Sequence, residues 1–435
     1  MNRKARMTET STRADAALPE PYFESEDHRF RLYQGDCLDL LPRLPDESVD
    51  VVFADPPYFL SNDGITCHAG RMVSVNKGKW DKSQGPLQDH EFCLQWLAEC
   101  QRIVKPTGSV WVSGTMHVIH SVGFAMQRLG MKLLNDITWV KPNPPPNLSC
   151  RYFTHATETV IWARKSEKAR HTFNYHLMKA VNGGKQMKSV WKIGAPPKDE
   201  KVFGKHPTQK PVALLERIIA ASTGENDLVL DPFSGSGTTG IAAVKGRRRF
   251  VGMEADPRFL GMAAMRYVGV PQADRPERIL ALVRASSTPG VGAATVSTQL
   301  GITPRQVRYY RQAAALLGFL AHEYGNWHLT NSGLALSRAP PQDGQSLVAQ
   351  AISASPLVRM AQRAARTERD GHARQRAVAE ALGRATPLSA ATCMRRARTL
   401  LSWLEWLTRY RESGQTFLFG DVAPLAQESD DAPVP

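Results

Sequence analysis

The residues whose types most clearly suggest a reaction lie in one short loop: Asp55, Pro56, Pro57 and Tyr58. They directly follow an apolar run at 49–54 that is typical of a buried strand. The Asp55 carboxylate and the Pro56 carbonyl can accept two N–H hydrogen bonds, and the two prolines stiffen the loop without adding donors. Two such acceptors would hold an aromatic amino group and free its nitrogen lone pair for attack on a methyl donor. The Tyr58 ring would offer a stacking face to an extruded base. Taken alone, the loop would also fit a stiff turn.

A second loop carries glycines at a place where a nucleoside could bind. Residues 231–239 (DPFSGSGTT) follow an apolar run and open a helix-like stretch. Gly235 and Gly237 let the backbone close around a ligand, and the loop matches neither a phosphate loop nor the usual dinucleotide pattern. Glu254 ends the next expected strand, 249–253, where a carboxylate can bind two ribose hydroxyls. This spacing predicts a nucleoside cofactor without a bound phosphate.

Two further stretches are candidates for this site. The residues at 206–211 (HPTQKP) are expected to complete the cofactor pocket, and a helix cap by Thr208 or Pro211 is the alternative. The Gly-rich, basic stretch 60–83 is predicted to be a mobile loop that closes over DNA. Its candidate DNA contacts are Lys77, Lys79, Trp80 and Lys82, although Trp80 could equally be a packing anchor.

The elements that must position these loops alternate along the chain. Strand-like runs are expected at 49–54, 109–113, 157–163, 227–230 and 249–253. Amphipathic, helix-like stretches are expected at 90–104, 116–129 and 211–223. Such alternation predicts an open α/β sheet with crossover helices, in which ligands bind at the carboxyl ends of the strands.

The composition is that of a globular protein with a polyanionic partner. The formal charge is +14 over 435 residues, which favours nucleic acid because Lys and Arg gain affinity by releasing counterions from phosphates. The six cysteines are scattered without a CxxC pair, so we expect neither a metal site nor disulfides, and a cytoplasmic location. No apolar run is long enough to cross a bilayer.

A change in composition divides the chain. Lysine is frequent up to Lys245 and absent afterwards, where Arg and Ala take over. We expect a disordered leader at 1–25, a first domain at 26–270, a linker at 271–290, an α-rich region at 291–420 and a disordered tail at 421–435.

The α-rich region contains an approximate repeat. LLGFL (316–320) recurs as LLSWL (400–404), and each closes an arginine-bearing helix that follows a shorter helix and a glycine-bearing turn. This layout predicts two winged-helix-like units, with 327–333 as the wing of the first. Their basic helices are expected to bind DNA or, equally, another protein.

Six stretches together point to a known family. They are ADPPYFLSN (54–62), GKWDK (78–82), WVSG (111–114), LNDITWVKPNPPPNLSCRYFTHATET (134–159), HPTQKP (206–211) and DPFSGSGTTG (231–240). Over about residues 27–270 the chain resembles the β-class amino-methyltransferases of bacterial restriction–modification systems, in which the catalytic motif precedes the cofactor motif. The resemblance is to the HinfI and DpnA subgroup of adenine-N6 methyltransferases.

The resemblance implies a Rossmann-like, seven-stranded sheet, S-adenosyl-L-methionine as cofactor, DNA as partner, base flipping and pairing as a homodimer. Asp rather than Ser before Pro-Pro-Tyr favours adenine N6, and cytosine N4 remains the alternative, with a DNA-binding regulator as another. The cofactor residues that it implies, together with those above, are Asp36, His206, Thr208, Lys210, Asp231, Phe233, Ser234, Gly235, Gly237, Thr238, Thr239 and Glu254.

The resemblance also implies where the DNA sequence is recognised. Members of the subgroup read GATC or GANTC, through a region that corresponds here to about 140–200. Arg or Lys would read guanine, and Asn or Gln adenine. The candidate residues are Asn147, Arg151, Lys185 and Lys188.

Overall fold

The computed structural model describes residues 17–25, 27–59, 65–68, 71–74, 81–147, 150–204, 206–287, 291–323 and 326–412. The chain divides into two compact units. Unit 1 comprises Met1–Pro197 and His206–Ala264, and unit 2 comprises Lys198–Lys205 and Met265–Pro435. The predicted DNA contacts at Lys77, Lys79 and Trp80, and the predicted tail at 421–435, lie outside the described residues.

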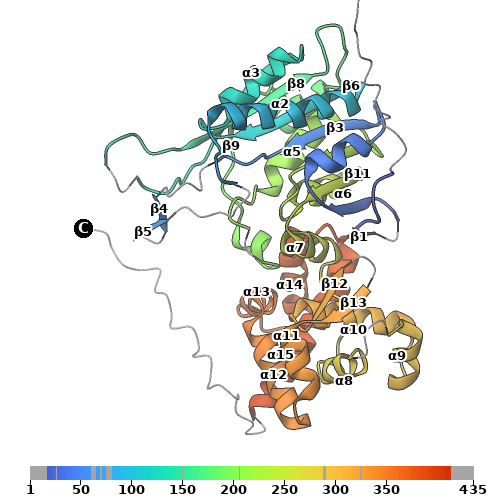
Figure 1. Cartoon of the computed structure of the whole chain (residues 1–435). Helices are drawn as coiled ribbons and strands as arrows, with labels where there is room; N and C mark the ends of the chain where they lie inside the picture. Colours follow the sequence, from blue (N-terminus) through green and yellow to red (C-terminus); the bar gives the residue numbers. More distant parts are fainter. Residues whose placement is uncertain are drawn as a thin grey trace, which may run out of the picture. The chain divides into compact units, whose positions relative to one another are not determined.

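Unit 1 is built on one mixed sheet with helices on both faces (Figure 1). In spatial order its strands are β1 (Phe23–Glu24), β2 (Phe30–Gln34), β11 (Arg249–Glu254), β10 (Leu228–Asp231), β3 (Val49–Ala54), β6 (Val104–Gly114), β8 (Thr157–Arg164), β7 (Lys132–Val140) and β9 (Val190–Lys192). The strands from β2 to β6 run parallel, and β8 lies antiparallel between β6 and β7.

The predicted α/β sheet is confirmed, but the predicted strand number of seven is wrong because the sheet has nine strands. The two short edge strands, β1 and β9, have two and three residues, which is too short for a hydrophobic period to show. β7 escaped prediction because Asn135, Asp136 and Thr138 interrupt its apolar residues. The predicted strands at 49–54 and 249–253 agree with β3 and β11 to within one residue.

The helices of unit 1 cover both faces of the sheet. They are α1 (Cys37–Leu40), the 3₁₀ helix η1 (Leu41–Arg43), α2 (Pro86–Ile103), α3 (Ile119–Arg128), α4 (Tyr175–Val181), α5 (Val212–Ser222), α6 (Thr238–Lys245) and the first part of α7 (Pro257–Val268), whose last residues belong to unit 2. Val52 and Ala54 of β3 share a core with α2 and α3. On the other face α6 lies so close that a Cβ on Gly240 would come within 2.5 Å of the Phe30 and Phe250 rings. Burial on both faces explains why β3 is a continuous apolar run.

The stretch that follows Asp55–Tyr58, the predicted catalytic loop, contains a hairpin. β4 (Ile65–His68) and β5 (Arg71–Ser74) pair antiparallel within the predicted mobile loop.

No helix in the described part of the chain is long and apolar enough to span a membrane.

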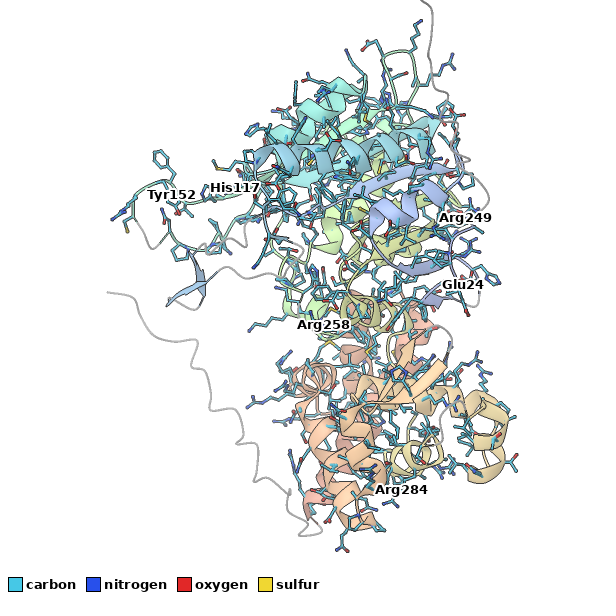
Figure 2. The ribbon with its side chains drawn as sticks, viewed as in Figure 1. Glu24, His117, Tyr152, Arg249, Arg258 and Arg284 are labelled. Atoms are coloured by element: carbon cyan, nitrogen blue, oxygen red, sulfur yellow. The ribbon has the colours of Figure 1, made fainter. Side chains whose placement is uncertain are left out.

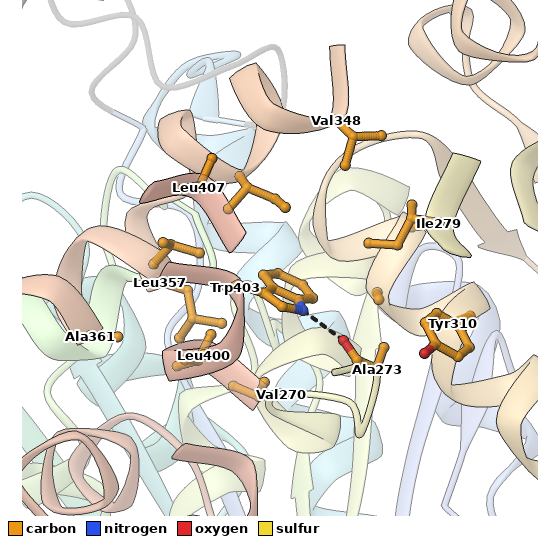
Figure 3. Close-up of a cluster of buried hydrophobic side chains, with 14 of the residues drawn as sticks. Val270, Ala273, Ile279, Tyr310, Val348, Leu357, Ala361, Leu400, Trp403 and Leu407 are labelled. Carbon is orange, nitrogen blue, oxygen red and sulfur yellow. Dashed lines mark hydrogen bonds between the residues drawn. The ribbon is translucent and has the colours of Figure 1, made fainter. Parts of the chain in front are cut away.

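Unit 2 is mainly helical. Its elements are the 3₁₀ helix η3 (Lys198–Lys201), α8 (Glu277–Ala285), α9 (Ala293–Leu300), α10 (Pro304–Leu316), β12 (Leu320–Glu323), β13 (Asn326–Leu329), α11 (Asn331–Arg338), α12 (Pro341–Ala354), α13 (Pro356–Ala365), α14 (Gly371–Ala385) and α15 (Ala390–Glu412). Its core surrounds Trp403 of α15, whose indole N–H donates to the Ala273 carbonyl at 2.6 Å (Figure 3).

The two predicted winged-helix-like units differ in the structure. In the first, α9 and α10 are followed by the antiparallel hairpin of β12 and β13. In the second, α14 and α15 are both helices, as predicted, but the residues described up to Glu412 include no strand after α15.

Candidate catalytic and cofactor site

The two predicted loops leave the sheet at the same edge. β3 ends directly before Asp55, and the parallel strands β10 and β11 end at Asp231 and Glu254. Figure 2 shows the direction of the strands. His117, just after the carboxyl end of β6, lies on the opposite side of the sheet from Arg249, the first residue of β11. The carboxyl ends of parallel strands meet at one edge, so the sheet itself brings the two loops together.

The Asp55 carboxylate is held by three donors. Its Oδ1 accepts from the Tyr58 hydroxyl at 2.7 Å and from the Ser113 hydroxyl at 2.6 Å. Its Oδ2 forms an ion pair with Lys210 Nζ. A carboxylate has about four acceptor positions. The described contacts occupy three of them, which leaves one, on Oδ2, for an incoming N–H group.

A second buried carboxylate completes this network. Glu158 Oε2 lies 3.2 Å from the Tyr58 hydroxyl, whose single hydrogen it shares with Asp55, and 3.8 Å from Lys210 Nζ, while Oε1 pairs with Lys141. Burial alone would raise the pKa of Glu158, but the two lysines outweigh it and hold that pKa below its usual value. Burial alone would lower the pKa of Lys210, but Asp55 and Glu158 hold it above its usual value. Both groups therefore stay charged around neutral pH.

Tyr58 is locked in place by the same network. Burial, and then the charges of Asp55 and Glu158, raise the pKa of its phenol well above the usual value, so the hydroxyl remains a donor. The side chain is 6% exposed, with Lys210 Nζ 5.2 Å from the ring centroid. Asp81, which is fully buried, accepts from the backbone N–H groups of Tyr58 and Phe59 at 2.8 and 2.9 Å. The loop is thus fixed at both its side chains and its backbone.

A cavity of about 200 Å³ adjoins the catalytic loop. Many of the predicted site residues line it, namely Asp36, Asp55, Pro56, Pro57, Tyr58, His206, Thr208, Phe233, Gly235 and Glu254. It is also lined by residues that the sequence did not single out, namely Gly35, Cys37, Asp81, Phe92, Pro232, Ala255 and Phe259. A second cavity, of about 240 Å³, shares Tyr58 with the first and includes Asp89, His117 and Ser121 in its lining.

Glu254 lines the first cavity. Its carboxylate accepts from the backbone N–H of Gly235 and of Asp256, both at 2.9 Å. Burial raises the pKa of Glu254. The glycine is needed because its φ is +50° and a Cβ there would lie 3.0 Å from the His206 ring. Aromatic rings, a carboxylate at a strand end and a close-approaching backbone fit a nucleoside of the S-adenosylmethionine type.

The remaining predicted cofactor residues do not line the cavity. Asp231 accepts from the Thr239 hydroxyl at 2.5 Å and from the Phe233 N–H at 3.0 Å, and burial raises its pKa to about 7. These bonds shape the turn that presents Phe233 and Gly235. The others are Ser234, Gly237 and Thr238, which belong to the same turn, and Lys210, which pairs with Asp55.

The predicted DNA contacts that the structure describes are not among the residues that line the cavity. Lys82, Arg151, Lys185 and Lys188 are exposed. The Asn147 side chain donates to the Tyr152 carbonyl at 2.6 Å. The structure does not bring these five residues to one place among the described contacts, and their roles stay predictions.

Several residues that hold the catalytic loop were missed. Ser113, Asp81 and Glu158, with Lys141, come from different parts of the chain and meet only in the fold. Each lies inside one of the stretches that carry the family resemblance, so the signal was their shared presence in those motifs.

In the described part of the chain, no group of three or more His, Cys, Asp or Glu side chains could hold a metal ion.

Comparison with known proteins agrees with this geometry. Residues 49–265 match the DNA methylase family, and residues 278–412 match a domain of unknown function (DUF7226). The chain is 52% identical over 248 residues to the Type II methyltransferase M2.MboI of Moraxella bovis, covering 57% of this chain and 91% of that protein. It is 52% identical over 250 residues to M2.DpnII of Streptococcus pneumoniae (57% and 92%), and 41% identical over 241 residues to M.HinfI of Haemophilus influenzae (54% and 67%). The chain therefore belongs to the DNA methylase family and is an S-adenosylmethionine-dependent DNA methyltransferase.

Proposed function

We propose that the enzyme transfers a methyl group to N6 of adenine in DNA, with Asp55 as the residue that holds the amino group. The observation that carries the proposal is the state of the Asp55 carboxylate. Three donors fix its direction, and one acceptor position on Oδ2 remains beside the cavity that Asp55 and Glu254 both line.

The chemistry follows from the weakness of an amino group on an aromatic ring. Its lone pair is delocalised, and hydrogen bonds to both N–H groups draw the nitrogen toward tetrahedral geometry. Asp55 Oδ2 would accept one and the Pro56 carbonyl the other. Because Lys210 and two hydroxyls already bind the carboxylate, it acts as a fixed acceptor rather than a strong base, and water takes the surplus proton.

The cofactor supplies an electrophilic methyl group when it is bound. Glu254 would hold its ribose hydroxyls, the backbone of Gly235 would approach its methionine part, and Phe233 and Phe259 would contact its adenine. The second cavity, which shares Tyr58 with the first, has room for part of a flipped base.

Two features of the sequence favour adenine over cytosine. The motif has Asp rather than Ser before Pro-Pro-Tyr, and the resemblance is to the adenine-specific subgroup. Cytosine N4 methylation through the same loop remains the second candidate. Mass analysis of nucleosides from treated DNA separates them, since N4-methylcytosine would overturn the choice of base.

For the recognition sequence we propose GATC, with GANTC as the second candidate, within a restriction–modification system. Support comes from the resemblance to the HinfI and DpnA subgroup, with Asn147, Arg151, Lys185 and Lys188 as candidate readers. Two duplexes that differ only in this site test it. Equal methylation of a GATC duplex and a duplex without GATC would contradict the assignment.

The role of Asp55 is tested by replacing it with alanine. Asp55→Ala should reduce transfer of a labelled methyl group to DNA by at least about a thousandfold, because it removes the acceptor made for the reacting nitrogen. Cofactor affinity, measured by calorimetry, should change little. Transfer at the wild-type rate by Asp55→Ala would sink the proposal.

We also propose that residues 277–329 form a winged-helix module, with α10 as its second helix-turn-helix helix and β12–β13 as its wing. Its support is the order of three helices followed by an antiparallel hairpin. The Thr303 capping box, in which Thr303 and Gln306 bind each other's backbone N–H, fixes the start of α10.

A further inference from the structure

The C-terminal unit carries an unusual group of arginines where α10 and α15 approach each other. Arg305 and Tyr309 lie on α10, and Arg395 and Arg396 lie on α15. The Arg305 Nε donates to the Tyr309 hydroxyl at 2.8 Å, and the Arg396 guanidinium lies 5.3 Å from the centre of the same ring. One tyrosine therefore joins two guanidinium groups from separate helices. We call these four residues the α10–α15 cluster.

Among the described contacts, no acidic side chain pairs with the arginines of this cluster. α10 has no Asp or Glu, and α15 has none before Glu405. The described contacts of Arg395 and Arg305 are to the hydroxyls of Thr392 and Tyr309. Burial lowers the pKa of Arg396; Tyr309 raises it, but Arg395 and Arg305 lower it, and the pKa stays below its usual value. Two of its buried nitrogens, Nε and Nη1, have no hydrogen-bond partner among the described residues.

Such a cluster destabilises the fold unless an anion binds to it. Guanidinium groups of like charge repel, and buried N–H donors without acceptors lose hydrogen-bond energy. A row of phosphates supplies both charge and acceptors, and arginine binds phosphate through two parallel N–H groups. Gln312 lies on the same helix as Arg305, and a side chain of this type can reach base edges.

We propose that the α10–α15 cluster binds the phosphate backbone of duplex DNA, as a second contact separate from the methylation site. This gives a function to the region that matches a domain of unknown function. It rests on the helices and charges of unit 2, together with the fact that the enzyme's substrate is DNA. DNA is favoured over an acidic protein partner because the chain already acts on DNA.

The proposal is tested by binding of the full chain to a duplex without GATC or GANTC. The variant Arg305→Gln/Arg395→Gln/Arg396→Gln should bind a duplex of about 30 base pairs at least tenfold more weakly near 0.15 M salt. The slope of log K against log salt should fall by about 2 to 3, because each lost phosphate contact contributes about 0.9. Methyl transfer to a short duplex at saturating concentration should keep its kcat, so a failed binding test does not touch the proposed catalytic role of Asp55.

A matched control makes the same change of charge elsewhere in unit 2. Arg363→Gln/Arg366→Gln/Arg369→Gln replaces three exposed arginines on and after α13, and it should bind within about twofold of wild type. Arg305→Gln/Arg395→Gln keeps the partly buried Arg396 and guards against misfolding of the triple variant. Wild-type affinity and salt slope in both cluster variants, or an equal loss in the control, would overturn the proposal.

Discussion

At the scale of residues, the site depends on charges that balance in pairs. Asp55 and Glu158 face Lys210 and Lys141 in a buried network, with the Tyr58 hydroxyl between the two carboxylates. The loop motif alone suggested a carboxylate free to accept. The fold adds that this carboxylate is already engaged on three sides, which fixes where the fourth hydrogen bond points.

Removing the shared cation should make the reaction pH-dependent. In Lys210→Met, the two carboxylates repel each other in a buried site and take up a proton near neutral pH. We expect kcat to fall on the order of tenfold at about pH 6.5 and to recover partly at about pH 9, when that proton leaves. Wild type should lack this dependence, since the pKa of Lys210 is raised and that of Glu158 is lowered, away from this range.

The control for this variant is Lys105→Met, which removes a lysine paired with Asp50 at 2.7 Å, outside the catalytic network. Its pH profile should follow that of wild type. A Lys210→Met enzyme with a wild-type profile would show that the lysine does not keep the carboxylates ionised.

At the scale of elements, the turn between β10 and α6 presents the proposed cofactor residues, and Gly237 is its tightest point. Its φ is +73°, and an added Cβ would lie 2.6 Å from the Ala263 Cβ. Gly237→Ala should therefore lower the free energy of unfolding by about 2–4 kcal/mol, from left-handed strain and overpacking. Denaturant unfolding measures it. Gly194→Ala is the control, because a Cβ there meets nothing within 4 Å, and equal losses in the two variants would contradict the steric explanation.

The same turn should make stability depend on pH through Asp231. The pKa of Asp231 is raised from 3.8 to about 7 in the folded state. The contribution of its protonated carboxyl to the free energy of unfolding is therefore fully present at low pH and is lost as the pH rises through about 7. Asp231→Asn removes this titration and keeps the shape. Relative to that variant, wild type should lose about 1 kcal/mol of unfolding free energy per pH unit between about pH 5 and 7. Parallel pH curves for the two proteins would refute it.

Much of this arrangement could be predicted because it is local. β3 and β11 are apolar runs that end directly before Asp55 and at Glu254, and parallel strands bring their carboxyl ends together. The partners of Asp55 could not be placed, because Ser113 and Lys210 lie 58 and 155 residues away along the chain. The edge strands β1 and β9 could not be predicted, because two or three residues are too few to show an alternating hydrophobic pattern.

At the scale of the whole molecule, the chain combines a DNA methyltransferase unit with a basic helical unit that carries the α10–α15 cluster. The formal charge of +14 is shared between lysines, all before residue 246, and arginines that dominate afterwards. Two separate contacts with DNA would raise affinity for long DNA without changing the chemical step. Accordingly, the cluster variants should raise KM for long DNA more than for a short duplex, and equal KM changes on both would contradict separate contacts.

The central claim is that Asp55 serves methylation of adenine N6 in DNA. It is tested most directly by sequencing, with modified-base detection, the genomic DNA of a methylation-free host that expresses either the wild-type chain or Asp55→Ala. The account predicts N6-methyladenine at one short sequence with wild type and none with the variant. N4-methylcytosine in the wild-type sample, or the same N6-methyladenine with Asp55→Ala, would contradict it.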